Sequence, residues 1–158
     1  MVLLPCNIAR EDKGITILLS LMRKYPFHAF IGNFQSNHQL IRKIADGAKD
    51  VMRNSGILRA VEVGNNPQYD PSFNAPAVIL VSVDKQESPK MAITAAQNAA
   101  TAGENMLLAA TSMGLGSCYV GSLAIALEND KIREACGLDE NNTTICAILV
   151  EYSKDDTP

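Results

Sequence analysis

The sequence predicts one α+β domain, residues 1–158, built around a central sheet. Its 158 residues suit a single domain, and 47% of them are hydrophobic, as in folded globular proteins. Residues 77–83 form an almost continuous apolar run, which is typical of a central strand covered on both faces. Residues 88–113 form a long alanine-rich segment that predicts a helix. Helices and strands are mixed around these two elements, without a repeat or a linker, and this order favours an α+β domain.

The first elements of the chain are one helix and one strand. Residues 11–22 are rich in Ile, Leu and Met and predict a buried helix. Pro26 ends this helix, because proline cannot continue its hydrogen bonding and restricts the residue before it. Residues 27–34 are aromatic and β-branched, which indicates a strand.

Residues 37–54 predict an amphipathic helix, because their apolar side chains recur at helical spacing. Either Ser36 or Asn37 can cap its beginning, and Gly56 follows its end. Residues 64–76 are dense in Asn, Pro, Gly and Asp, and we expect a loop there.

The helix predicted at residues 88–113 has apolar residues on almost every face. Such a helix is either buried all round, or buried on one side and packed against a partner subunit on the other. Ser88 and Pro89 are suited to its first turn, and Gly114 is suited to terminate it.

The last part of the chain predicts a strand at residues 117–120 and a short helix at residues 129–136, closed by Gly137. Residues 143–152 are rich in Thr, Ile and Val and predict the final strand.

Composition excludes several classes of function. The net charge of −3 gives no support for nucleic-acid binding. The apolar runs are too short to cross a bilayer, and residues 1–6 lack the basic start of a signal peptide. The four cysteines form no C-x-x-C pair, and the chain has two histidines, so we expect no metal site. We expect buried free thiols in a cytoplasmic protein.

A glycine-rich junction follows the long helix: residues 114–121 read GLGSCYVG. In one interpretation, Gly114 caps the helix and Gly116 permits the turn into the next strand. In the other, the bare backbone lets a flat ligand approach closely. The junction is not a dinucleotide-binding fingerprint, because the helix precedes it, and no Gly-Lys-Ser/Thr follows as in a P-loop.

Residues 105–110 (NMLLAA) together with the junction resemble the signature of the nitroreductase family, in which an N-M-x-L-A-A-type helix leads to G-L-G-x-C-x-x-G. Residues 74–79, 137–140 and 148–152 are similar to other family segments, although Asp139, Glu151 and Ser153 depart from the family pattern. The resemblance implies a nitroreductase-like sandwich, with a mostly antiparallel sheet flanked by helices and the long helix buried at a dimer interface.

The resemblance also implies a site for FMN. In the family, the backbone after the cysteine of this signature lies against the flavin ring, and one N–H faces the reactive N5 atom. The corresponding positions here are Tyr119, Val120 and Gly121, with Gly116 and Cys118 beside them. An N–H at this place can stabilise charge that develops at N5.

Residues 20–27 resemble, in altered form, the family segment that contacts the ribityl chain and the ring edge of the flavin. On this basis Ser20, Arg23 and His28 are candidate flavin contacts. A residue such as Arg23 more often belongs to a solvated helix end, and His28 is at least as typical of an ordinary strand residue.

The implied activity is that of an FMN-dependent oxidoreductase that passes electrons from NAD(P)H to a small acceptor such as a nitroaromatic compound or a quinone, as a homodimer. The family's N-terminal R-R-S-x-R-type segment, whose arginines bind the FMN phosphate, has no counterpart in this sequence. Each charged hydrogen bond to phosphate contributes about 1.5–3 kcal/mol, so this difference favours an alternative. The alternative is a degenerate, non-catalytic nitroreductase-like dimer with weak or no flavin binding.

Overall fold

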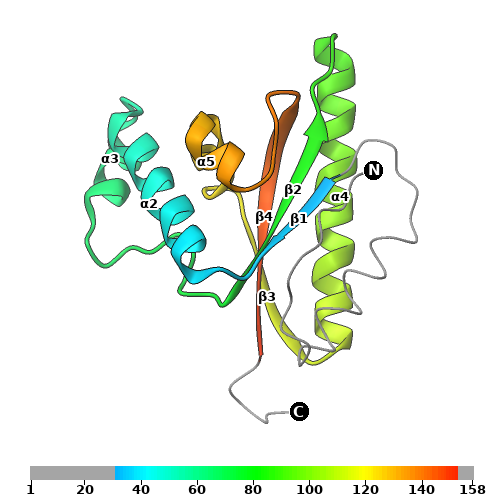
Figure 1. Cartoon of the computed structure of the whole chain (residues 1–158), viewed down its shortest axis with the longest axis horizontal. Helices are drawn as coiled ribbons and strands as arrows, with labels where there is room; N and C mark the ends of the chain where they lie inside the picture. Colours follow the sequence, from blue (N-terminus) through cyan, green and yellow to red (C-terminus); the bar gives the residue numbers. More distant parts are fainter. Residues whose placement is uncertain (1–30, 153–158) are drawn as a thin grey trace.

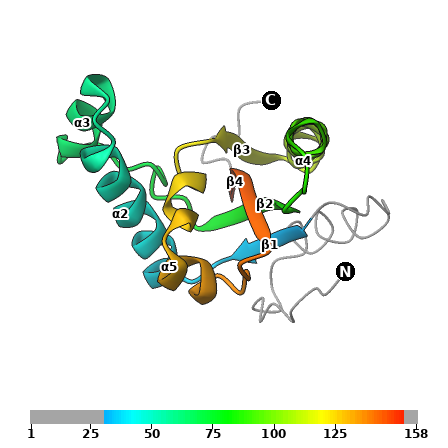
Figure 2. The same ribbon diagram turned by 90° about the horizontal axis from the view of Figure 1, so that it is seen from above.

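Helices lie on both faces of one antiparallel sheet in the computed structural model, which describes residues 31–152 and the side chains from residue 36 onward (Figure 1). The long helix α4 (Pro89–Ser112) covers one face, and α2 (His38–Asn54) and α5 (Asp130–Ala135) lie on the other (Figure 2). The predicted α+β fold class is confirmed.

The sheet that the described residues form has four strands in the order β1-β2-β4-β3, each antiparallel to its neighbours. The strands are β1 (Ile31–Gln35), β2 (Ala77–Asp84), β3 (Leu115–Val120) and β4 (Asn142–Tyr152). Every residue of β2 except the last is buried. This double-sided burial explains the apolar run in the sequence, since each side chain meets one of two cores.

The strands predicted at residues 77–83, 117–120 and 143–152 are confirmed, each with ends one or two residues longer. The strand predicted at residues 27–34 is confirmed from residue 31 onward as β1. Its first four residues and the helix predicted at residues 11–22 lie outside the described residues.

α4 begins and ends at the predicted residues. The Ser88 hydroxyl accepts a hydrogen bond from the Met91 N–H at 3.2 Å, and Pro89 occupies the first turn, where its missing N–H does no harm. Gly114 has a φ of +72°, the left-handed conformation that glycine adopts at a helix end without steric penalty.

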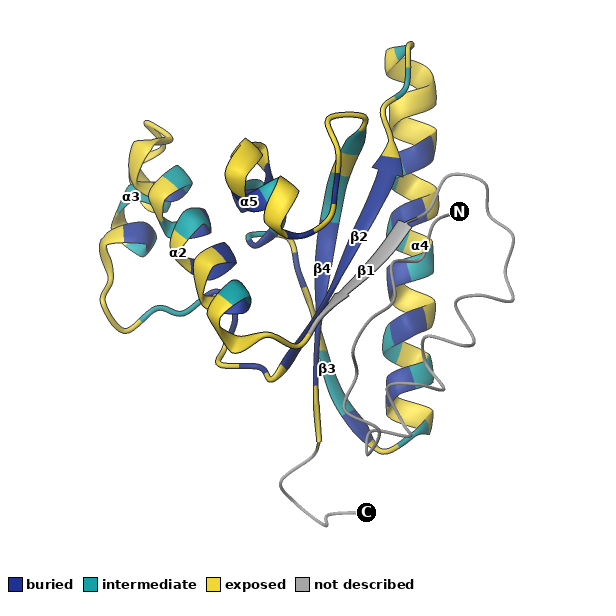
Figure 3. Ribbon diagram, in the orientation of Figure 1, coloured by how far each residue is buried: buried dark blue, intermediate teal, exposed yellow. Residues whose placement is uncertain are grey.

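α4 is buried on one face and exposed on the other, as the colours of Figure 3 show. Its buried residues recur at helical spacing: Ala95, Ala99, Gly103, Met106 and Ala110. On the far face, Ile93 and Leu108 are each 61% exposed. The expectation of a helix buried all round is therefore wrong for the single chain, because the sheet can cover only one side of α4. Burial on one side is confirmed.

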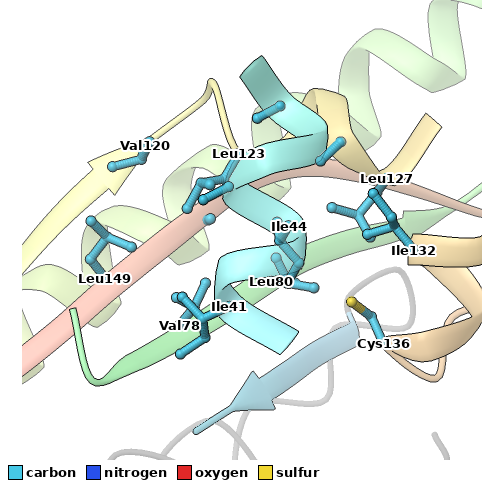
Figure 4. Packing of buried hydrophobic residues seen from close by; sticks show 14 of the residues in the cluster. Ile41, Ile44, Val78, Leu80, Val120, Leu123, Leu127, Ile132, Cys136 and Leu149 are labelled. Atoms are coloured by element: carbon cyan, nitrogen blue, oxygen red, sulfur yellow. The ribbon is translucent and has the colours of Figure 1, made fainter. Parts of the chain in front are cut away.

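The sheet separates two cores: the α4 core, which α4 forms with one face of the sheet, and the α2 core, which lies between the other face and α2 (Figure 4). Ile41 and Ile44 of α2 share this core with Val78 and Leu80 of β2. Asn37, one of the two predicted caps, accepts hydrogen bonds from the N–H groups of the first turn of α2. The predicted amphipathic helix is thus confirmed, and its apolar stripe is the face that covers the sheet.

Two short elements were not predicted: α3 (Leu58–Asn65) and the 3-10 helix η1 (Ala124–Glu128). Neither has a side-chain cap, and both are too short to show apolar residues repeating at helical spacing in the sequence. α3 packs on α2 and extends away from the sheet (Figure 1). Within residues 31–152, no helix is long and apolar enough to cross a membrane.

Candidate functional site

The glycine-rich junction connects the end of α4 to β3, which lies at the edge of the described sheet. An ideal Cβ built on Gly114 would meet no atom within 4 Å, so its glycine is required by the positive φ and not by crowding. The capping interpretation of Gly114 is confirmed, and any ligand role of the junction rests on β3 and the turn after it.

Alternate side chains of β3 point to the two opposite cores. Tyr119 pairs with Ile148, which belongs to the α4 core, and Val120 pairs with Ala147, which belongs to the α2 core. Because successive residues of a strand point to opposite faces, Gly116 and Cys118 lie on the same face as Val120. The five predicted site residues in the described part of the chain therefore lie along β3 and directly after it, but not on one face.

Gly121 follows β3 directly and is exposed, and an ideal Cβ on it would meet no atom within 4 Å. The backbone at the end of β3 is thus open on one side, as a flat ring would need. Gly116 is different: its ideal Cβ would lie 3.3 Å from Cγ of Glu151, the residue opposite it on β4. The space beside Gly116 is already taken by a side chain of the same domain.

The turn after Gly121 is held by packing and hydrogen bonds. The Gly121 carbonyl accepts from the Ala124 N–H at 3.1 Å, and Leu123 is fully buried in the α2 core. The Ser122 hydroxyl lies 3.3 Å from the Tyr69 hydroxyl, which comes from the loop before β2. The open side of Gly121 therefore belongs to a backbone that neighbouring residues fix in place.

The loop that carries Tyr69 contains a strained pair. Phe73 and Asn74 both have positive φ, at 49° and 57°. These values lie in the left-handed backbone region that residues other than glycine rarely adopt. Asp70 stabilises this shape: its carboxylate accepts hydrogen bonds from the Ser72 hydroxyl at 2.6 Å, the Ser72 N–H at 2.9 Å and the Asn74 N–H at 3.1 Å.

Burial of the Asp70 carboxyl would by itself raise its pKa. The hydrogen bonds from Ser72 and Asn74 and the positive charge of Arg42, 3.6 Å away, outweigh this and hold the pKa below its ordinary value of 3.8. Sequence reasoning did not single out Asp70. The signal was a turn-type D-P-S segment, in which an Asp side chain bonds the backbone two residues on.

The cysteines were expected to be buried, and this is wrong for Cys118. Cys118 is exposed on β3, the edge strand of the described sheet, whereas Cys136 and Cys146 are buried. Burial raises the pKa of Cys136 to about 11, against a small opposing influence of Lys43. Such a thiol stays protonated at neutral pH. Cys6 lies outside the described residues.

Three predicted site residues, Ser20, Arg23 and His28, also lie outside the described residues. They remain predictions. The described part of the candidate site is therefore the set predicted to face the flavin ring: Gly116, Cys118, Tyr119, Val120 and Gly121.

An open groove of about 1030 Å³ runs along α2 beside the start of α5, with Arg42, Lys43, Asp46, Asp50 and Lys131 among its lining residues. Charges of both signs line it, and no residue of β3 does. The groove is thus separate from the strand end that the sequence singles out.

Comparison with known proteins now decides the family. The family model described as "Nitroreductase family" matches residues 18–150. The chain belongs to the nitroreductase family. A curated relative from Archaeoglobus fulgidus, named as a candidate NADH dehydrogenase/NAD(P)H nitroreductase, is 32% identical over 83 residues. This match covers 52% of the chain and 48% of the relative, so the chain matches about half the length of that protein.

Solved structures give the same fold for this nitroreductase-family chain. A nitroreductase with bound FMN from Bacteroides fragilis superposes with a TM-score of 0.78 at 20% identity, covering 99% of this chain and 82% of the other. A nitroreductase with bound FMN from Desulfitobacterium hafniense gives a TM-score of 0.75 at 16% identity, covering 96% and 83%. At such identities the likeness establishes the fold, and the predicted nitroreductase-like sandwich is confirmed.

Proposed function

We propose that this protein is an FMN-dependent oxidoreductase that takes electrons from NAD(P)H and passes them to a small acceptor such as a nitroaromatic compound or a quinone. Family membership supports the flavin chemistry, and the Bacteroides fragilis and Desulfitobacterium hafniense structures contain FMN. The name of the Archaeoglobus fulgidus relative supports a nicotinamide nucleotide as the donor.

The observation that carries this proposal is the open backbone at Gly121, at the end of an edge strand and before a firmly packed turn. A flat ring can approach it closely, because no side chain among the described residues lies where a Cβ of residue 121 would be. The residues present thus fit the ring of FMN. When bound, FMN would supply reversible hydride transfer between the nicotinamide and the acceptor.

The protein's own part in the reaction would be orientation. The backbones of Tyr119, Val120 and Gly121 would lie against the ring, with an N–H group of this stretch directed to N5. Val120 and Leu123, 7% and 0% exposed, anchor the strand end in the α2 core. A preorganised N–H of this kind stabilises developing charge without reorganising at the moment of reaction. Ser20, Arg23 and His28 are proposed contacts to the rest of the cofactor.

We also propose that the active form is a homodimer joined along the exposed face of α4. Ile93 and Leu108 lie on this face, 61% exposed in the single chain, and the opposite face of the helix is used by the core. Exposed apolar side chains on a helix that is already buried on its other side are typical of a subunit interface.

FMN titration of the purified protein tests the function. We expect binding of FMN in the wild type and its loss in Gly121→Val, because the valine side chain would fill the open space beside the backbone. Gly121→Ala should have an intermediate effect. The thermal unfolding of the FMN-free variants should match that of the wild type.

Gln68→Val, an exposed loop position without a proposed role, is the matched control and should bind FMN as the wild type does. Equal FMN affinity in Gly121→Val and wild type would show that the ring does not lie at Gly121. Turnover of NADH or NADPH with a quinone or nitroaromatic acceptor then identifies the donor and acceptor class.

One observation favours the alternative of a non-catalytic, nitroreductase-like protein. Glu151 stands where the family pattern has glycine, and its side chain lies against Gly116 on β3. The Glu151 side chain thus occupies space that a glycine at this position would leave open. A colourless wild-type protein that gains neither absorbance nor thermal stability with excess FMN would support this alternative and contradict the oxidoreductase.

A further inference from the structure

The ring of Tyr119 lies against the bare backbone of Gly103 in the middle of α4. An ideal Cβ on Gly103 would lie 3.2 Å from Cε2 and 3.4 Å from Cδ2 of the Tyr119 ring, and 3.6 Å from Cδ1 of Ile148. Glycine within a helix costs roughly 0.5–1 kcal/mol relative to alanine. The close approach of the tyrosine ring gives a physical reason for a glycine at this place.

The other end of the Tyr119 side chain is also held. Its hydroxyl faces the Cys146 thiol of β4, and the interaction with this thiol, together with burial, raises the pKa of Tyr119 to about 12. Cys146 is fully buried and lies two residues from Ile148, the residue directly opposite Tyr119. The side chain therefore runs diagonally along β4, within the reach of a cross-strand tyrosine.

Specific contacts hold Tyr119 more than burial does, because the residue is still 41% exposed. Tyr119 and Val120 are the last paired residues of β3 before the chain leaves the sheet at Gly121. Val120 anchors this strand end in the α2 core, and Tyr119 anchors it from the side of α4. The position of the Gly121 backbone thus depends on two anchors that point in opposite directions.

We propose that Tyr119 is a positioning residue: held between Gly103 of α4 and Cys146 of β4, it sets the position of the backbone at Val120 and Gly121 that faces the flavin ring. This inference rests on the proposed function. It gives the Tyr119 side chain a role apart from the backbone contact, and it couples α4 mechanically to the flavin site.

A double-mutant cycle on the full chain tests the role, with Gly103→Ala and Tyr119→Ala alone and together. The readouts are FMN affinity by fluorescence, the midpoint potential of bound FMN and thermal unfolding of the FMN-free protein. We expect Gly103→Ala to weaken FMN binding about fivefold or more in the wild-type background, and less than about twofold in Tyr119→Ala, because the displaced ring is then absent.

The midpoint potential separates positioning from general stability. We expect Gly103→Ala to change the ratio of oxidised to reduced FMN affinities by about threefold, which is ~14 mV for a two-electron couple. The conservative Tyr119→Phe keeps the ring on Gly103 and should retain most of the affinity that Tyr119→Ala loses. A role confined to folding would lower thermal stability and leave the potential unchanged.

The outcomes distinguish the two proposals. A wild type that binds no FMN overturns the proposed function and the positioning role together. A wild type that binds FMN, with equal effects of Gly103→Ala in both backgrounds or an unchanged potential, overturns the positioning role alone. If Gly103→Ala does not fold, the cycle of Tyr119→Ala and Cys146→Ala replaces it. Non-additive effects on FMN affinity are expected there, and additive effects overturn the role.

Discussion

At the scale of single residues, Asp70 shows how one carboxylate can set the shape of a loop. Two consecutive residues after it, Phe73 and Asn74, have positive φ, a conformation that costs of order 1–3 kcal/mol per residue and persists only where neighbours enforce it. The Asp70 carboxylate accepts three hydrogen bonds from this segment. Through Tyr69 and Ser122 the loop also contacts the turn after Gly121, so Asp70 supports the candidate site indirectly.

Asp70→Asn should lower the free energy of unfolding by about 1–3 kcal/mol at neutral pH, since hydrogen bonds to a charged acceptor are lost. The pKa of Asp70 is depressed in the fold, so its stabilising contribution is complete above the ordinary value of 3.8 and is lost as the pH falls through the lower folded-state value. Urea unfolding of wild type and variant as a function of pH measures the difference, which should shrink below about pH 4.

Arg42→Gln is the control for this prediction. It removes a charge 3.6 Å from Asp70, and the Arg42 side chain is 62% exposed, so the loss should stay below about 1 kcal/mol. A difference between wild type and Asp70→Asn that does not change between pH 7 and pH 3 would contradict the role assigned to the carboxylate.

At the scale of elements, the contact between α2 and α3 depends on Gly64. An ideal Cβ on Gly64 would lie 3.0 Å from the Arg53 nitrogen, the Lys49 carbonyl oxygen and the Met52 Cβ. Two of these are backbone atoms of α2, which cannot move aside as a flexible side chain can. α3 is thus held by close helix packing, which explains why an uncapped segment of eight residues is helical.

Gly64→Ala should therefore destabilise the protein by about 1–3 kcal/mol, although alanine is the better helix former. Hydrogen exchange of the α3 amides should accelerate more than exchange in β2, since the clash lies at α3 alone. Glu62→Ala, at an exposed position of the same helix, should change stability by less than about 0.5 kcal/mol. Unchanged α3 exchange in Gly64→Ala would refute close packing at this crossing.

At the scale of the whole molecule, α4 is the element with two roles. One face completes the core over β2 and β4, and the other is left exposed by the single chain. The proposed dimer covers this second face. If the partner subunit completes the flavin site, loss of the dimer should also weaken FMN binding. This effect would come from the lost partner, because Leu108 has no described contact with the turn at Gly121.

Leu108→Glu should convert the dimer to a monomer in sedimentation velocity, because it places a charge in an apolar contact. Leu58→Glu is the matched control: Leu58 is 77% exposed, but it lies on α3, outside the proposed interface. This control should keep the dimer. A Leu108→Glu variant that sediments like the wild type would contradict the proposed interface.

Much of the fold could be predicted because its signals are local. The caps of α2 and α4 are Asn37 and Ser88, whose side chains bond backbone groups two or three residues away. The helical stripe of α2 and the apolar run of β2 are likewise read within one element. α3 could not be predicted in this way, because the packing at Gly64 that stabilises it involves residues of another helix.

The candidate site was predicted in part for the same reason. The junction of residues 114–121 and the family it belongs to are visible in one short stretch of sequence, so Gly121 could be singled out. The exposure of Cys118 could not, because it depends on how the rest of the chain packs around β3. The sequence also could not predict that the Glu151 side chain fills the space beside Gly116, because Glu151 lies far along the chain from Gly116.

The sequence by itself determined the family, the α+β class, and the beginnings and ends of α2 and α4, since capping, helical spacing and apolar runs act over a few residues. Only the tertiary structure decided which surfaces meet: Tyr119 on Gly103, α3 on α2, and the open side of Gly121. These contacts join residues that are distant in the chain, and they depend on shape and close packing, which no local pattern records.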